Sequence, residues 1–321
     1  MRRHTKFLLI TATLLTLIGS ISFTGVMFML NWDFSKLSTK NYVTTNHIVD
    51  KTYHDINIDT DIANITFAHS EDHKTTVVCY EDDAAKHTVA VVDGTLEIKT
   101  ASNQKWYDHI GINVGSPKIT VYLPTSEYGK LTIVESTGNI VIPDGYHFEN
   151  MDITTTTGGI QCRSQVSEKA SFKASTGKIT LNDVSAETID ISVSTGEITA
   201  ENITCSGDFT VSVSTGDASL NSVTCKSLIT TGSTGELHLT DVIATETFRI
   251  ERDTGDIKFD RCDASEIYVK TDTGHVKGTL LTDKVYIIQT DTGNIDVPKT
   301  TTGGKCEITT DTGDIRIQVA Q

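Results

Sequence analysis

Apolar and polar side chains alternate along most of this chain, and the alternation is tied to a repeated tripeptide. Ten copies of Ser-Thr-Gly, Thr-Thr-Gly or Asp-Thr-Gly, from Gly138 to Gly313, follow one register in which successive glycines are 19 or 20 residues apart. Apolar residues recur seven and five positions before the glycine and two and four positions after it. Around Gly196 these residues are Ile189, Ile191, Ile198 and Ala200. Alternation with a period of two predicts short strands with one buried face.

A third apolar pair completes the repeat. It lies seven and nine residues after the glycine, for example at Val184 and Ala186 or at Val223 and Cys225. One coil cannot bury three inward pairs alone, so successive coils must stack with about 4.8 Å between their strands. The crossover rule for parallel strands favours a right-handed coil. The sequence therefore predicts an all-β fold, a single-chain right-handed parallel β-solenoid (β-helix) with rungs of 19–20 residues over residues 131–321.

The tripeptide itself predicts a turn. Its glycine suits a backbone with positive φ, and the Ser or Asp two residues earlier is a short side-chain acceptor. We expect this acceptor to close the turn onto a backbone N–H group.

The pattern is less regular before Leu131. Strand-like segments are found at residues 56–58, 62–67, 75–80, 87–92, 96–98 and 119–123. Asp93-Gly94 is a hairpin or turn signal. We expect residues 47–130 to form an irregular N-terminal part of the same solenoid, after a linker at residues 31–46. Residues 101–117, which include Trp106 and Tyr107, are predicted to be its longest loop.

The N-terminus carries an uncharged apolar run at residues 7–30, preceded by Arg2, Arg3 and Lys6. At about 1.5 Å per residue, such a helix spans a hydrocarbon layer of roughly 30 Å. The basic residues before the run and Asp33 after it predict a cytoplasmic N-terminus at residues 1–6. We therefore expect a single-pass protein of the cell membrane, with a transmembrane helix at residues 7–30 and an extracellular solenoid.

A cleaved signal peptide is the alternative. Residues 7–18 could be its apolar region, followed by the small residues Gly19, Ser20 and Ser22. The transmembrane interpretation is favoured because the apolar run continues through residues 26–30.

The formal net charge of −15 bears on partners. A phosphate-binding surface needs clustered Lys and Arg, and the chain has no such cluster. Nucleic acid is therefore excluded as a partner.

Five of the six cysteines fall at inward positions of the repeat: Cys162, Cys205, Cys225, Cys262 and Cys306. The chain has no C-x-x-C motif and no Cys/His pairing at zinc spacing. We interpret the thiols as small buried hydrophobic groups. Cys205 and Cys225 share one column on adjacent rungs, so a disulfide between them is the alternative.

Asp253, Asp272, Asp291 and Asp311 are expected to stack along one turn column. Their carboxylates could bind calcium, but the Gly-Gly-x-Gly-x-Asp pattern of calcium-binding repeats is absent. A solvated turn column is the favoured interpretation. The sequence assigns no catalytic residue, no cofactor and no metal ligand.

The segment from Ile119 to Pro124, the segment from Lys130 to Ile133 and the following Ser-Thr-Gly-x-Ile-x-Leu rungs resemble a bacterial domain-of-unknown-function family labelled "putative adhesin". That family includes the LiaG-like proteins of Gram-positive envelopes, and the resemblance covers roughly residues 53–321. It implies a β-solenoid outside the cytoplasm and linked to the membrane. It brings no active-site residue with it.

The sequence favours a function in binding rather than catalysis. Rung lengths vary by one residue only, which leaves no insertion to form a catalytic cleft. We expect a membrane-anchored binding or presentation surface of the cell envelope, with a protein or wall-polymer partner at the solenoid face or the C-terminal edge. The alternatives are an accessory component of an envelope-stress signalling system and, less favoured, a polysaccharide-active enzyme. The last rung, at residues 314–319, is expected to expose its strand edge for docking or pairing.

Overall fold

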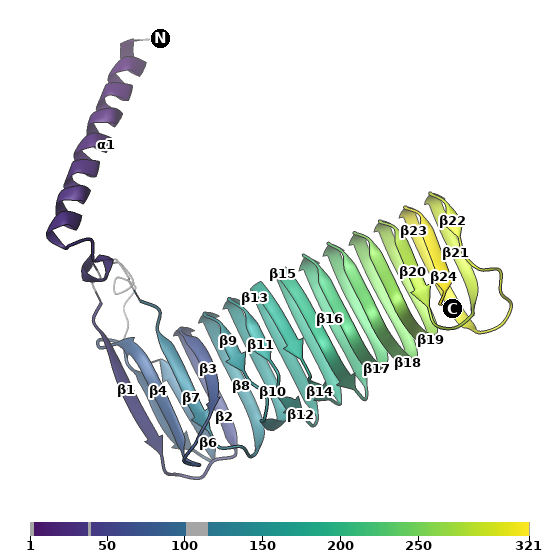
Figure 1. Ribbon diagram of the computed structural model, residues 1–321, viewed down its shortest axis with the longest axis horizontal. Coiled ribbons are helices and arrows are strands. Elements are labelled where there is room, and N and C mark those ends of the chain that lie inside the picture. The colour runs from purple at the N-terminus through teal and green to yellow at the C-terminus, as the bar shows by residue number, and fades with distance from the viewer. Residues whose placement is uncertain (1–2, 38–39, 101–114, 321) are drawn as a thin grey trace.

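The computed structural model describes residues 3–37, 40–100 and 115–320. One long helix, α1 (Arg3–Met29), projects from a rod of strands, and a short 3-10 helix, η1 (Phe34–Leu37), lies between them (Figure 1). The 24 strands of the described residues belong to one continuous sheet that winds around the rod. The predicted parallel β-solenoid with one N-terminal apolar helix is confirmed.

The regular body extends from β8 to β20, and its neighbouring strands are parallel. The strands are β8 (Glu127–Thr137), β9 (Ile140–Ile142), β10 (His147–Thr157), β11 (Ile160–Cys162), β12 (Gln165–Val166), β13 (Lys169–Asn182), β14 (Ser185–Ala186), β15 (Thr188–Cys205), β16 (Asp208–Thr215), β17 (Ala218–Thr234), β18 (Leu237–Thr254), β19 (Ile257–Thr273) and β20 (Val276–Leu280).

Residues with the same position in the repeat lie over one another. Ile198 of β15 pairs with Ala218 of β17, which pairs with Leu237 of β18, which pairs with Ile257 of β19. All four are buried in the core. The predicted common interior of Ile198, Leu237 and Ile257 is confirmed.

The repeated glycines also form a column, and Gly235 shows why no other residue fits. Its φ is +132°, and a Cβ atom built on it would collide with the carbonyl oxygen of Gly216 in the preceding rung. The close approach of consecutive backbones, together with the positive φ, therefore requires glycine.

A second corner lies six residues after the five repeat glycines from Gly177 to Gly255. The residues at this corner have φ between 52° and 55°: Asp183, Asn202, Ser222, Asp241 and Arg261. Asn and Asp tolerate the left-handed region better than most residues. The guanidinium of Arg261 is ion-paired with the carboxylate of Asp241 in the preceding rung.

The turns are bonded differently from the prediction. Among the described residues, the Ser and Asp side chains two positions before the glycines make no hydrogen bond, so their predicted capping role is wrong. In some turns the side chain of the residue directly after the glycine accepts a backbone N–H of the neighbouring rung instead. Asp217 Oδ1 accepts the N–H of Glu236 at 2.8 Å, and Asp256 Oδ1 accepts the N–H of His275 at 2.9 Å. This position faces the neighbouring backbone, whereas the earlier one points to solvent.

The N-terminal end contains both parallel and antiparallel strands: β1 (Tyr42–Val49), β2 (Asp55–Ile62), β3 (Asn64–His69), β4 (Thr75–Asp82), β5 (His87–Val92), β6 (Thr95–Thr100) and β7 (Lys118–Leu123). β2 lies between β6 and β8, and β3 lies between β7 and β9. β5 and β6 form an antiparallel hairpin at Asp93-Gly94, and β4 pairs antiparallel with β1 and β7. The first turn of the solenoid is therefore covered by later strands.

At the C-terminal end, too, the last strands of the chain lie between earlier strands and not at the end of the stack. Its strands are β21 (Lys284–Thr292), β22 (Ile295–Asp296), β23 (Gly304–Thr312) and β24 (Ile315–Val319). β23 lies between β19 and β21, and β24 lies between β20 and β22. The prediction that residues 314–319 expose the terminal edge is wrong, because β21 and β22 form the outermost rung (Figure 1).

This order also explains side chains that were expected to be fully inward. Ile295 is 49% exposed, and Tyr286 and Ile288 are only partly buried. Tyr286 and Ile288 pack against the core on one side, and within the described chain no rung covers the other side of β21 and β22.

Candidate functional site

At the N-terminal end of the solenoid, a thiol, a carboxylate and an imidazole lie close together inside the apolar core. β4 ends at Asp82 and β5 begins at His87, and a turn at residues 83–86 joins them. Alternation along β4 points Val77, Cys79 and Glu81 inward, and His87 opens β5 with its side chain inward. A chain reversal thus brings Cys79, Glu81 and His87 together.

Glu81 and His87 form a buried pair. Glu81 Oε2 accepts the backbone N–H of His87 at 2.6 Å, and it lies 2.8 Å from Nδ1 of the same imidazole. Glu81 Oε1 is buried and has no hydrogen-bond partner among the described residues. One ligand atom each from Cys79, Glu81 and His87 lies within 4.8 Å of the others. Burial, and to a lesser extent the charge of Glu81, raises the pKa of the Cys79 thiol to about 12.

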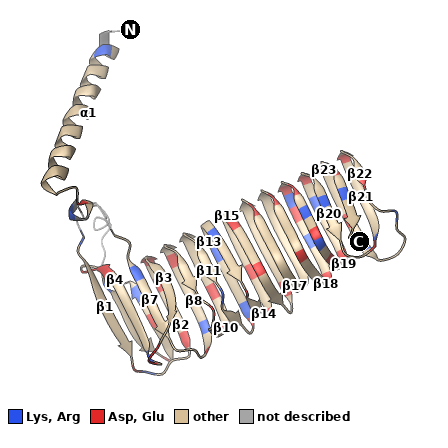
Figure 2. Cartoon of the chain, viewed as in Figure 1, with Lys and Arg blue, Asp and Glu red and all other residues tan. Residues whose placement is uncertain are grey.

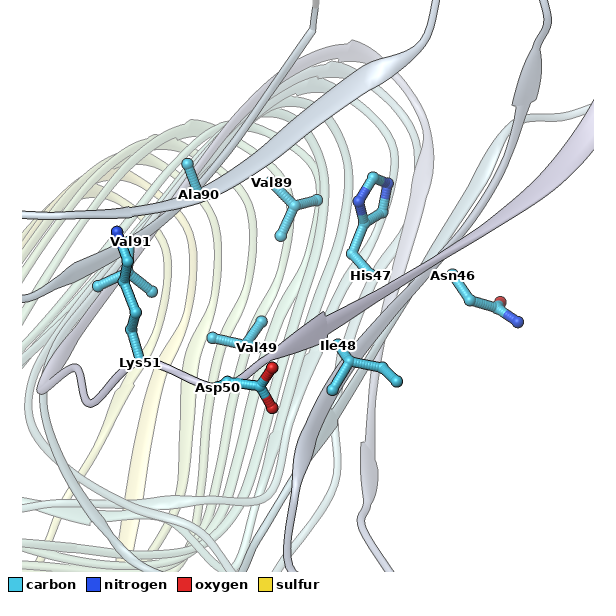
Figure 3. Close-up of a pocket in the computed structure, with 9 residues that line it drawn as sticks. All are labelled: Asn46, His47, Ile48, Val49, Asp50, Lys51, Val89, Ala90 and Val91. Carbon is cyan, nitrogen blue, oxygen red and sulfur yellow. The ribbon is translucent and has the colours of Figure 1, made fainter.

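A cavity of about 600 Å³ lies between β1 and β5 at the same end of the solenoid, and Cys79, Glu81 and His87 do not line it. Figure 3 shows His47, Val49, Val89 and Val91 around the space, whereas Ile48 points away from it. His47 Nε2 is buried and has no hydrogen-bond partner among the described residues. The cavity therefore has a mixed lining, in which valines lie beside His47 and the polar residues Asn46, Asp50 and Lys51.

Two further buried ionisable groups lie in the column three residues before the glycines. Glu135 accepts hydrogen bonds from the backbone N–H groups of Ala63 and Thr137, each at 3.1 Å, and from the hydroxyl of Thr60. Burial outweighs these bonds and raises its pKa to about 7.

Arg252 lies in the same column. Its Nε and Nη2 have no partner among the described residues, and Nη1 lies 3.5 Å from the carbonyl oxygen of Gly235. The guanidinium occupies space above Gly232, which has no side chain. Burial lowers the pKa of Arg252.

The cysteines of the regular rungs are all free and buried. Cys205 and Cys225 share a column and remain unbridged. Cys262 and Cys306 are likewise enclosed in the core, with pKa values raised by burial to about 11 and about 12.

The four aspartates stack as expected but in a different order: Asp253, Asp272, Asp311 and Asp291. They are exposed, and Figure 2 shows acidic residues recurring at this edge of the distal rungs. In the described parts of the chain they are not in a group of three metal-binding side chains; Cys79, Glu81 and His87 are the only such group.

The sequence pattern did not predict this group. Cys79 and His87 are eight residues apart, across a turn, which is not a zinc-finger spacing. The signal in the sequence was the pair Cys79 and Glu81 at a spacing of two, followed by a histidine at the first inward position of the next strand. The loop prediction at residues 101–117 lies largely outside the described residues.

The sequence matches the family described as "Toastrack DUF4097" over residues 53–208 and 204–321. The chain belongs to the Toastrack DUF4097 family. The resemblance drawn from the rungs is thereby confirmed at the level of the family. No curated protein matches the Toastrack chain.

Several solved structures are similar to this Toastrack chain. A "putative lipid binding protein" from Parabacteroides distasonis has 18% identity and a TM-score of 0.50, and the match covers 76% of this chain and 98% of that one. A "putative adhesin" from Bacteroides fragilis has 18% identity and a TM-score of 0.42, over 88% of this chain and 99% of that one. A "putative adhesin" from Parabacteroides distasonis has 12% identity and a TM-score of 0.41, over 85% and 98%. At 18% identity the likeness to the "putative lipid binding protein" describes the fold alone and assigns no ligand to the Toastrack chain.

Proposed function

We propose that this chain is a membrane-anchored protein of the bacterial cell envelope, whose solenoid binds a polypeptide partner at its distal end. α1 supports the anchor. Its segment Thr5–Met29 is 25 residues long and apolar, and the solenoid does not bury it. At about 1.5 Å per residue it is long enough for a bilayer core of about 30 Å. Its basic residues lie at its N-terminal end, which favours a cytoplasmic N-terminus and an extracellular solenoid (Figure 2).

The observation that carries the binding function is the outermost rung. β21 pairs with β23 on one side, and within the described chain its other side has no partner. Val285 is 36% exposed and Ile287 is 53% exposed on this strand. An unpaired strand of nine residues offers alternate N–H and C=O groups to an extended segment. Peptide backbone satisfies that ladder in full, so the edge favours a polypeptide over a glycan.

Site-specific photo-crosslinking in intact cells tests this proposal. A photoreactive residue replaces Ile287 in one strain and Ile243 in the other; Ile243 is 42% exposed but lies in β18, within the paired body. We expect a protein adduct from position 287 and none from position 243. The double variant Val285→Lys/Ile287→Lys should prevent partner binding without unfolding, because both side chains are exposed.

The identity of the adduct decides between roles. A host or wall protein supports adhesion, and a membrane sensor supports an accessory role in envelope-stress signalling. Equal labelling at both positions, or none at position 287, contradicts distal-edge binding. Membrane fractionation tests the anchor separately, since a full-length chain in the membrane fraction supports it and a shortened, released chain contradicts it.

A further inference from the structure

Three side chains at the N-terminal end of the solenoid form a site that is separate from the proposed binding edge at the distal end. Cys79 and Glu81 are fully buried on β4, and His87 on β5 is 7% exposed. Their ligand atoms lie within 4.8 Å of one another. Sulfur, carboxylate oxygen and imidazole nitrogen thus converge on one point inside the core.

Glu81 has a buried carboxylate oxygen that a cation would satisfy. Its Oε2 is bound by His87, but Oε1 has no donor among the described residues, although no part of the residue reaches solvent. A buried carboxylate oxygen without a partner is costly. The described part of the chain places no Lys or Arg against Glu81; its ion-pair partner there is His87.

We propose that Cys79, Glu81 and His87 bind a divalent transition-metal ion of the zinc class. Thiolate, imidazole and carboxylate are the three ligand types that zinc takes in proteins, at about 2.0–2.3 Å. Calcium and magnesium are excluded by the sulfur and nitrogen donors, since they prefer oxygen ligands. Three protein ligands leave one position of a tetrahedral ion for a water molecule or an external ligand.

Binding requires the thiolate of Cys79 and the free lone pair of the imidazole. The thiol proton therefore leaves for solvent as the metal–sulfur bond forms. The charge of the ion reverses the effect of burial on the thiol.

The position of the site indicates what the ion does. β4 pairs with β1 and β7, whereas β5 pairs with β6. The turn at residues 83–86 joins these two parts of the end. An ion held by both strands would clamp the two faces together where the solenoid meets the membrane-proximal segment.

Cobalt(II) is the probe for this site. The full-length chain without a histidine tag is purified in detergent, treated with a chelator, kept reduced and titrated with cobalt(II). We expect saturation at one equivalent, a thiolate-to-cobalt charge-transfer band in the near ultraviolet, and loss of that band when zinc(II) is added. The melting temperature should rise on metal addition.

Matched variants assign the ligands. Cys79→Ala should abolish the charge-transfer band, and Glu81→Gln and His87→Gln should each weaken binding at least about tenfold. Cys162→Ala is the control, because Cys162 is also buried and free but belongs to no such group. Far-ultraviolet circular dichroism checks that each variant keeps its strands.

Three results would overturn the proposal. The first is a wild-type chain without a thiolate band at stoichiometric cobalt. The second is a band that survives Cys79→Ala, and the third is a band that Cys162→Ala removes to the same extent. None of these outcomes depends on the crosslinking result at Ile287, so the two proposals stand or fall separately.

Discussion

The buried carboxyl of Glu135 makes the solenoid less stable as the pH rises, and Glu135→Gln should remove this dependence. The folded protein raises the pKa of Glu135 from 4.5 to about 7, mainly through burial. Between these values the native state holds a proton that the unfolded chain has lost. The free energy of unfolding therefore falls as the pH rises through this window.

The difference between 4.5 and about 7 corresponds to about 3 kcal/mol, most of it lost by pH 8. Glutamine fits the same hydrogen bonds. Its oxygen can accept from the backbone N–H groups of Ala63 and Thr137, and its amide N–H can donate to the Thr60 oxygen once that hydroxyl, which donates to the Glu135 carboxylate, has rotated. We expect Glu135→Gln to be close to neutral at pH 4.5 and to stabilise the protein by about 2–3 kcal/mol at pH 8.5.

Urea unfolding followed by circular dichroism from pH 4.5 to pH 8.5 measures the effect. Glu201→Gln removes the same charge from an exposed position and serves as the control. A stability difference that does not change with pH, or a Glu135→Gln variant that is less stable than wild type at pH 8.5, would refute the reasoning.

Two further substitutions test the interior columns. Arg252→Met should stabilise the protein by about 2 kcal/mol in urea unfolding, because it removes a buried cation that has two nitrogens without hydrogen-bond partners. The control Arg249→Met, at an exposed site, should change stability by less than about 0.5 kcal/mol. Destabilisation by Arg252→Met would show that the buried guanidinium makes a stabilising interaction. Gly235→Ala should cost about 3–5 kcal/mol, because its Cβ collides with the backbone of Gly216. Gly94→Ala also has a positive φ but meets no atom within 4 Å, so it should cost only about 1–2 kcal/mol; equal thermal destabilisation of the two would refute the close-packed glycine column.

The sequence predicted the columns because one physical constraint repeats. The spacing of the glycines places Ile198, Leu237 and Ile257 in one phase, and stacking is the one way to bury them. Because the repeats are so alike, their spacing does not determine the order in which the rungs lie along the stack. Thr292 and Thr312 have equivalent surroundings in the repeat, so the pattern does not determine that β23 lies between β19 and β21.

A local signal for this exchange was present. The third inward pair is apolar from Val184 and Ala186 to Cys262 and Ala264, but the next rungs have Asp283 and Thr302 at the second of these positions. Gly303-Gly304 then provides the narrow backbone with which β23 enters the stack, since a Cβ on either residue would collide with a neighbouring strand. Such breaks in a column are stronger evidence for the order of rungs than the length of the repeat.

The repeat pattern could not predict the group of Cys79, Glu81 and His87, for a different reason. It lies in the irregular segment, where no column fixes the relative position of two strands. β4 and β5 pair with different neighbours, so their approach depends on the tertiary arrangement of the whole end.

The position of the outermost rung has a mechanical consequence. β20 and β23, which precede and follow this rung in the chain, are both held inside the stack, so the segment between Leu280 and Gly304 is tethered at both ends. It cannot peel away progressively like the last coil of a spring; it can only lift off as a closed loop, which gains less chain entropy than a free tail would. We infer that the tip resists fraying although one of its strand edges stays open, as a surface that must hold a partner against pulling would require.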